Sequence, residues 1–210
     1  MGPRVVRGRR PALPVTPTPS DLTVSPSRAF LLGHEATPIG PTERPGPFDI
    51  VFLDRDGTIN VHRPGYVTRV ADFTVIDGAL EAIARFNAAG ARVVLVTNQR
   101  GLSTGLLGED ELATVHGHLV AEAARVGARL DAIFVCPHDH GTCDCRKPLP
   151  GLLTRAFGRM TWASPARCVL VGDQPTDVAA ADAAGVRSLL VDASEFTLRD
   201  AAETLLCQTP

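Results

Sequence analysis

Two aspartates spaced two residues apart, Asp54 and Asp56, follow a short apolar run in the stretch Phe-Leu-Asp-Arg-Asp-Gly-Thr. Residues two apart in extended backbone face the same side, so both carboxylates can aim at one point while Arg55 turns away. Two carboxylates this close repel each other unless a cation lies between them, and all-oxygen ligation favours Mg²⁺. Gly57 permits the sharp turn that follows. The pattern predicts a magnesium site, although the same residues alone could form a turn that caps a helix.

Two further groups of polar side chains follow apolar runs later in the chain. Thr97 and Asn98 offer a hydroxyl and an amide that can donate hydrogen bonds to a phosphate oxygen. Asp173 supplies a third carboxylate for the cation, and Asp177 a fourth nearby. Each group alone more often caps the end of a strand, but their joint occurrence favours one phosphate and metal site.

Lysine occurs once in the chain, at Lys147, although the sequence contains 21 basic residues in all. A composition that otherwise uses only arginine suggests that a compact ammonium is needed at this position, where a planar guanidinium would not fit. We therefore predict that Lys147 belongs to the site, against the alternative of a chance surface lysine.

A cluster of cysteines and histidines directly precedes this lysine. Its density suits a tetrahedral Zn²⁺ ion with soft ligands, and four protein ligands would make the metal structural. The predicted ligands, which leave His140 spare, are Cys136, His138, Cys143 and Cys145. A disulfide is disfavoured because Cys168 and Cys207 are left over and no secretory signal is recognisable. The ordered loop would place Arg146 and Lys147 at the mouth of the site.

Short β-rich runs alternate with helical stretches from residue 48 onward, which is typical of βαβ units. The expected strands are 48–53, 92–97, 132–135, 168–171 and 188–191, and the expected helices are 78–89, 109–126, 152–160 and 177–184. These elements predict an α/β fold with a doubly wound, mainly parallel, Rossmann-like sheet. The polar groups would then gather at the carboxyl ends of the strands, where such sheets bind ligands.

Composition sets the limits on class and partners. Hydrophobic residues make up 44% and charged residues 21%, as in an ordinary soluble domain, and the longest apolar runs are too short to span a membrane. Residues 1–47 hold ten of the 17 prolines and carry a net charge of +3, whereas the remainder carries −5. We expect a disordered tail over 1–47, one domain over 48–210, a cytoplasmic location and no nucleic-acid partner.

As an ordered set, the aspartate pair, Thr97-Asn98, Lys147 and Gly172-Asp173-x3-Asp177 resemble the four motifs of the haloacid dehalogenase superfamily of phosphotransferases. The resemblance, over residues 48 to about 192, implies that Asp54 is the nucleophile and Asp56 the acid and base. It also implies that Thr97 and Lys147 stabilise the transferring group, and that Asp54, the Asp56 carbonyl and Asp173 hold Mg²⁺.

The zinc loop followed by Arg-Lys-Pro resembles the branch that contains heptose bisphosphate 7-phosphatases and histidinol-phosphate phosphatases. The heptose enzymes are the more similar, which implies a small phosphorylated sugar as substrate. The resemblance also implies that this sugar is bound by Arg63, Tyr66, Asn98, Arg100 and Arg146. Arg100, Thr104 and Gln174 depart from the usual heptose pattern, and the zinc loop is nearer in length to the histidinol-phosphate group.

The intervals between the motifs leave no room for a separate cap domain, so loops must close the site. Three alternatives to a monomeric metabolite phosphatase stay open: a receiver domain with a lone phosphoacceptor, a catalytically silent zinc protein, and a nucleic-acid 3′-phosphatase.

Overall fold

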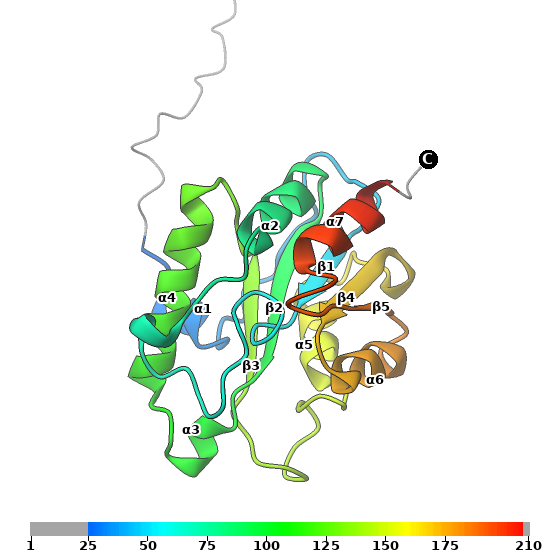
Figure 1. Ribbon diagram of the computed structural model, residues 1–210. Coiled ribbons are helices and arrows are strands. Elements are labelled where there is room, and N and C mark those ends of the chain that lie inside the picture. Colours follow the sequence, from blue (N-terminus) through cyan, green and yellow to red (C-terminus); the bar gives the residue numbers. More distant parts are fainter. Residues whose placement is uncertain (1–24, 208–210) are drawn as a thin grey trace, which may run out of the picture.

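The computed structural model describes residues 25–207, which form a five-stranded parallel sheet with helices on both faces (Figure 1). The strand order is β3-β2-β1-β4-β5. The strands are β1 (Ile50–Leu53), β2 (Arg92–Asn98), β3 (Ala132–Cys136), β4 (Cys168–Gly172) and β5 (Arg187–Leu190). All neighbours pair in parallel register. The predicted doubly wound α/β fold is confirmed.

Two helical layers sandwich the sheet and bury its two faces separately. One layer contains α2 (Ala79–Ala88), α4 (Glu109–Arg125) and α7 (Leu198–Cys207), and the other contains α5 (Gly151–Arg159) and α6 (Pro175–Ala183). In β1, Val51 and Leu53 pack into the first core and Ile50 and Phe52 into the second. This alternation explains why the central strand is apolar throughout. Helix α7 was not predicted.

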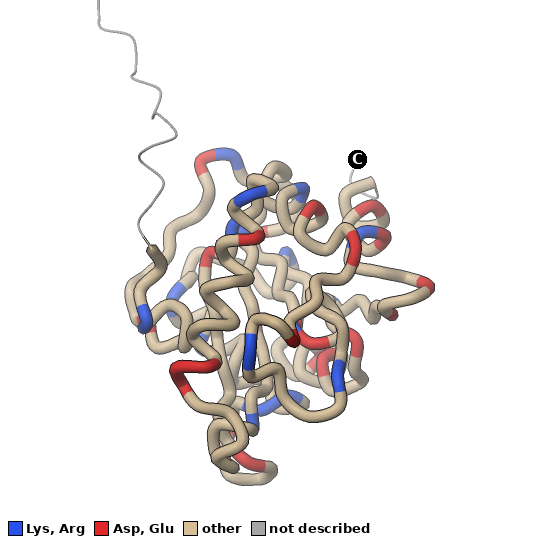
Figure 2. The backbone as a smooth tube through the Cα atoms, turned by 60° about the vertical axis from the view of Figure 1, so that its left-hand side comes forward, with Lys and Arg blue, Asp and Glu red and all other residues tan. Residues whose placement is uncertain are grey.

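The segment between β1 and β2 holds a loop, the 3-10 turn η2 (Val70–Asp72) and α2. Between β2 and β4 lie the short α3 (Gly101–Thr104), α4, β3, the cysteine loop and α5, and the turn η3 (Pro165–Arg167) leads into β4. Acidic and basic positions are interspersed along the backbone in Figure 2. No helix among residues 25–207 is both long and apolar enough to cross a membrane.

The prediction of a disordered tail over 1–47 is wrong for residues 25–47, here called the N-terminal arm. The arm begins with α1 (Arg28–Leu31), which contacts α4 and β3, and Leu32 is 4% exposed. Side chains of the domain satisfy its backbone, because Arg159 Nε donates to the Thr37 carbonyl at 2.9 Å and Trp162 Nε1 to the Ile39 carbonyl at 2.6 Å. Proline-rich sequence can therefore be held without regular structure of its own. Residues 1–24, the rest of that prediction, lie outside the described residues.

At Gly33 the arm makes a close approach to β3. This glycine has φ of +73°, and a Cβ here would lie 2.9 Å from the Val135 amide nitrogen. A larger residue would therefore push the arm away from the strand.

Candidate active site

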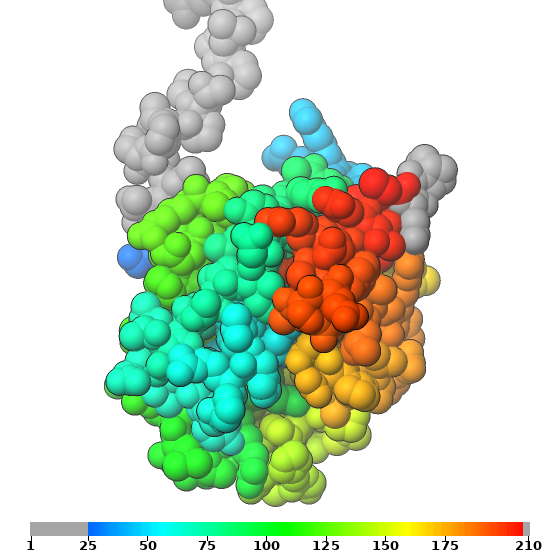
Figure 3. Space-filling model, in the orientation of Figure 1, coloured from blue at the N-terminus to red at the C-terminus, as the bar shows by residue number. Residues whose placement is uncertain are grey.

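A cavity of about 310 Å³ opens at the carboxyl ends of β1, β2 and β4. The predicted site residues that line it are Asp54, Asp56, Arg63, Tyr66, Thr97, Asn98, Arg146, Lys147 and Asp173. In Figure 3 the cyan segment after β1, the yellow-green loop after β3 and the gold start of α6 meet on the lower part of the visible face. The strand ends thus bring together groups that are far apart in sequence.

Three carboxylates and one ammonium form the floor of this cavity. One oxygen each from Asp54, Asp173 and Asp177 lies within 4.8 Å of the others. Lys147 Nζ lies 2.7 Å from Asp54 Oδ1 and 2.5 Å from Asp177 Oδ1, and it donates to the Val96 carbonyl at 2.9 Å. Asp177 was predicted from the sequence only as a fourth carboxylate nearby, and its contact with Lys147 was not predicted.

Burial and neighbouring charges perturb the titration of these groups. Burial raises the pKa of Asp54 to about 7; the Lys147 ammonium opposes this rise, and the Asp177 and Asp56 carboxylates add to it. Burial lowers the pKa of Lys147, but Asp54 and Asp177 outweigh it and leave this pKa raised. Three acids against one ammonium leave an excess of negative charge when all are ionised, which a divalent cation would neutralise.

The donor set fits a hard cation such as Mg²⁺. All the candidate ligand atoms are oxygens, and Asp173 Oδ1 is buried without a hydrogen-bond partner. Burial is the largest cause of the raised pKa of Asp173. Gly57, with φ of +86°, lets the backbone pass this carboxylate, since a Cβ there would lie 2.2 Å from Asp173 Oδ2. The turn predicted from Gly57 is therefore also a close approach to the ligand.

The Asp56 carboxylate is held by several donors rather than facing Asp54 freely. Arg55 Nη2 lies 3.0 Å from its Oδ1 and 2.9 Å from its Oδ2. Asn60 Nδ2 donates to Oδ1 and Gln99 Nε2 to Oδ2, each at 3.0 Å. Burial raises the pKa of Asp56. The Arg55 charge and these hydrogen bonds lower this pKa by more, so it lies below its usual range.

The prediction that Arg55 turns away is wrong. Strand β1 ends at Leu53, so strand alternation no longer applies at Arg55. Its long side chain bends back to Asp56 and is 1% exposed.

Asn98 and Thr97 are occupied by protein contacts in addition to lining the cavity. Asn98 Nδ2 donates to the Lys147 carbonyl and the Lys147 amide donates to Asn98 Oδ1, both at 3.1 Å. The amide of Asn98, assigned from sequence to a phosphate, therefore fixes the backbone of Lys147. Thr97 Oγ1 accepts from Gln99 Nε2 at 2.9 Å. Gln99 was not predicted, although it directly follows these two residues in the sequence.

The rim contains most of the predicted substrate-binding residues. Arg146 Nη1 is buried without a hydrogen-bond partner, and Arg63 Nη1 lies 3.1 Å from Asp72 Oδ1. Arg100 is not among the residues that line the cavity, because its Nε donates to Asp139 Oδ1 at 2.5 Å. The structure thus does not bring Arg100 to the site. It adds His62, Gln174 and Thr176, none of which was assigned a role in binding substrate from the sequence.

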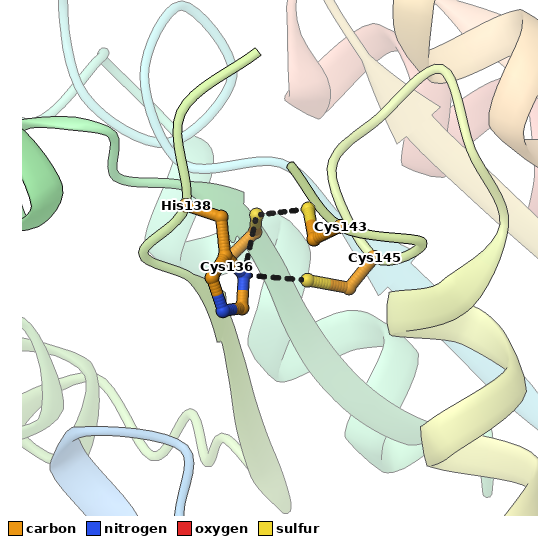
Figure 4. Close-up of side chains that lie close together, drawn as sticks. All are labelled: Cys136, His138, Cys143 and Cys145. Carbon is orange, nitrogen blue, oxygen red and sulfur yellow. Dashed lines mark hydrogen bonds between the residues drawn. The ribbon is translucent and has the colours of Figure 1, made fainter. Parts of the chain in front are cut away.

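The four predicted zinc ligands form a second cluster (Figure 4), whose last member, Cys145, directly precedes Arg146 of the cavity lining. The Cys136 Sγ atom lies 3.7 Å from Cys143 Sγ and 3.8 Å from His138 Nδ1, which is 3.2 Å from Cys145 Sγ. Tetrahedral bonds of about 2.3 Å to sulfur place ligand atoms at roughly such separations. The three cysteines of the cluster form no disulfide. The donor set fits one soft tetrahedral ion, and His140 lies outside it as predicted.

Comparisons with known proteins agree with this geometry. A family model described as HAD-hydrolase-like matches residues 144–207. A D-glycero-beta-D-manno-heptose-1,7-bisphosphate 7-phosphatase of Vibrio cholerae is 38% identical over 163 residues, covering 74% of this chain and 87% of that protein. A D-glycero-alpha-D-manno-heptose-1,7-bisphosphate 7-phosphatase of Mycobacterium tuberculosis is 38% identical over 138 residues, covering 65% and 73%.

Among solved structures, the crystal structure of D,D-heptose 1,7-bisphosphate phosphatase from B. bronchiseptica, complexed with magnesium and phosphate, superimposes with a TM-score of 0.71. Its sequence identity is 34%, and the match covers 77% of this chain and all of that one.

Proposed function

The chain belongs to the HAD-like phosphatases, and from this premise we propose that it removes the 7-phosphate of a D-glycero-D-manno-heptose 1,7-bisphosphate with Mg²⁺. The observation that carries the proposal is the group of Asp54, Asp173 and Asp177, two of which pair with the buried Lys147, at the floor of one cavity. Relatives with the same fold act, by their names, on heptose bisphosphates.

Asp54 is the nucleophile in this proposal. The pKa of Asp56 lies below its usual range in the free protein, so in this proposal Asp56 takes up a proton as the phosphate ester binds. One of the Asp54 carboxylate oxygens attacks phosphorus in line, the bond from phosphorus to the sugar oxygen breaks, and the departing oxygen takes that proton from Asp56. Water then attacks phosphorus of the aspartyl phosphate and gives a proton to Asp56. This attack breaks the bond between the Asp54 oxygen and phosphorus. Both steps return the enzyme to its starting protonation state.

Lys147 neutralises charge on the transferring group. Its ammonium is fixed by Asp54, Asp177 and the Val96 carbonyl, so it needs little reorganisation during the reaction. Bound Mg²⁺, held by Asp54, the Asp56 carbonyl and Asp173, would supply further neutralisation of the phosphoryl oxygens. Thr97 would donate its hydroxyl hydrogen to one of these oxygens.

The rim residues would hold the sugar and its second phosphate. Arg146 is the strongest candidate, since its buried Nη1 has no protein partner and a guanidinium can grip phosphate with two parallel hydrogen bonds. Arg63 and Tyr66 lie on the loop after β1 that lines the same cavity. Arg100 would act indirectly, by holding Asp139 of the cysteine loop.

A structural Zn²⁺ ion in the cluster of Cys136, His138, Cys143 and Cys145 would order the loop that carries Arg146 and Lys147. Four protein ligands leave no open position for a reacting water. We also propose that the enzyme works as a cytoplasmic monomer on small metabolites rather than on nucleic acid or at membranes.

Steady-state kinetics on parallel substrates tests the assignment. Both anomers of heptose 1,7-bisphosphate, fructose 1,6-bisphosphate and histidinol phosphate would be compared with Mg²⁺ present and with Asp54→Asn as the control. We expect a heptose bisphosphate to have the highest kcat/KM and the variant to be inactive. A more than tenfold preference for histidinol phosphate would overturn the sugar assignment, and activity of Asp54→Asn would overturn the mechanism.

A further inference from the structure

A buried histidine on α4, His116, lies behind the cavity and has no part in the chemistry above. It is 0% exposed and is not among the cavity-lining residues. Both ring nitrogens are engaged: Nδ1 lies 2.6 Å from the Leu31 carbonyl oxygen, and Nε2 lies 3.1 Å from Arg55 Nη1. This histidine therefore connects the N-terminal arm to the residue beside Asp56.

These contacts fix the tautomer of the ring. A carbonyl oxygen only accepts hydrogen bonds, so Nδ1 carries the hydrogen and donates it to Leu31. Burial and then the charge of Arg55 lower the pKa of His116 to about 3, which leaves the ring neutral. Nε2 is then an acceptor, and Arg55 Nη1 donates to it. One tautomer satisfies both partners.

Arg55 spans the distance between His116 and Asp56. Its Nη1 faces the histidine, while its Nη2 lies 3.0 and 2.9 Å from the two Asp56 oxygens. Burying a guanidinium is costly unless its donors are paired. Here His116 pairs the Nη1 donor of Arg55, so the Nη2 donor can bond to Asp56. Asn60 and Gln99 donate to Asp56 as well, but neither contributes a charge.

We propose that His116 is a positioning residue for the hydrolysis: its ring, oriented by the Leu31 carbonyl, fixes the Arg55 guanidinium, which holds the Asp56 carboxylate where it exchanges protons with the leaving oxygen and with water. The proposal rests on the proposed function of Asp56. His116 acts only through Arg55 and does not touch substrate. The N-terminal arm is thereby part of the support of the active site.

Kinetics of His116 variants test the proposal. In His116→Leu both ring contacts are lost, and we expect kcat to fall about 10- to 100-fold with KM within about twofold, because misplacing a proton-transfer group affects turnover rather than phosphate binding. His116→Gln offers an acceptor toward Arg55 and a donor toward Leu31, so we expect it to recover to within about threefold of wild type. The matched control is His118→Leu, on the same helix, whose ring packs edge-on against Phe73 and should leave kcat unchanged.

Three further measurements keep the test decisive if His116→Leu does not fold. His116→Asn keeps a donor near Leu31 but is too short to reach Arg55, and it should lose kcat as the leucine variant does. Nitrogen-15 NMR of the wild-type protein should show the Nδ1–H tautomer of His116. In an Arg55→Lys background, replacing His116 should change kcat by less than about threefold, since the two residues act as one unit.

An Nε2–H tautomer, wild-type kcat in His116→Asn, or fully additive effects with Arg55→Lys would overturn the proposal. A wild-type enzyme that hydrolyses no phosphate monoester would instead refute the proposed function. The NMR measurement still reports on the His116 contacts in that case, so the two failures are distinguishable.

Discussion

Binding of Mg²⁺ is expected to release protons from Asp54 in an amount set by pH. Burial raises the pKa of this acid from 3.8 to about 7; Lys147 opposes the rise, and Asp177 and Asp56 add to it. In the metal-free protein, Asp54 therefore contributes stability that is fully present below pH 3.8 and is lost as pH rises through about 7. Mg²⁺ requires the ionised carboxylate, so the neutral acid must lose its proton when the ion binds.

The magnitude follows from this raised pKa. With a pKa of about 7, Asp54 gives up about 0.9 proton per bound ion at pH 6 and about 0.1 at pH 8. The apparent affinity for Mg²⁺ is then expected to be about tenfold higher at pH 8 than at pH 6. Isothermal titration calorimetry in two buffers of different ionisation enthalpy measures both quantities.

Three variants isolate the source of the protons. His62→Gln removes a titratable ring from the cavity wall, and Asp77→Asn alters an exposed aspartate; both should keep the release seen in wild type. In Asp54→Asn, the proton release on Mg²⁺ binding should no longer depend on pH. Equal release at pH 6 and pH 8 in wild type, or undiminished release in Asp54→Asn, would refute the reasoning.

Three other perturbations follow from the geometry. Lys147→Arg should lower kcat on an aryl phosphate at least about 100-fold, because the larger head group does not fit a 4% exposed site 2.7 Å from Asp54, and wild-type turnover would contradict this. Gly57→Ala should weaken Mg²⁺ binding about tenfold in calorimetry, since its Cβ would displace Asp173; unchanged affinity would count against this prediction. Elemental analysis should find one zinc ion per chain. Removal of this zinc by a chelator, or the substitution Cys143→Ser, should lower the melting temperature by several degrees (~5 °C). Protein that purifies without zinc would disprove the site.

The sheet and the floor of the cavity could be predicted from sequence because their signals are local. An apolar run followed by Asp54 or Asp173 marks a strand end, and parallel strands bring such ends to one edge. Lys147 could be assigned because it is the only lysine in the sequence. The cysteine loop was equally recognisable, since its ligands are close in sequence.

The remaining features depend on partners that sequence spacing does not reveal. Arg55 was expected to point away because strand alternation was extended past the end of β1, and nothing nearby in sequence indicates His116, 61 residues later, as its acceptor. Arg100 was assigned to substrate from the family resemblance, and its pairing with Asp139 could not be predicted because Asp139 lies in another loop. The arm was expected to be disordered because of its many prolines, and the hydrogen-bond donors that hold it, such as Arg159 and Trp162, are distant in sequence, in α5 and the segment after it.

The close approach of Gly33 to β3 has a consequence for solubility. Strand β3 ends the sheet order, and a strand in that place can recruit extended segments from other molecules through its unpaired backbone groups. The arm contacts this strand through α1 and at Gly33, and we expect it to hinder such recruitment. A protein truncated to begin at residue 48, where the sequence pattern alone would start the domain, would expose that strand and is expected to aggregate even with an intact cavity.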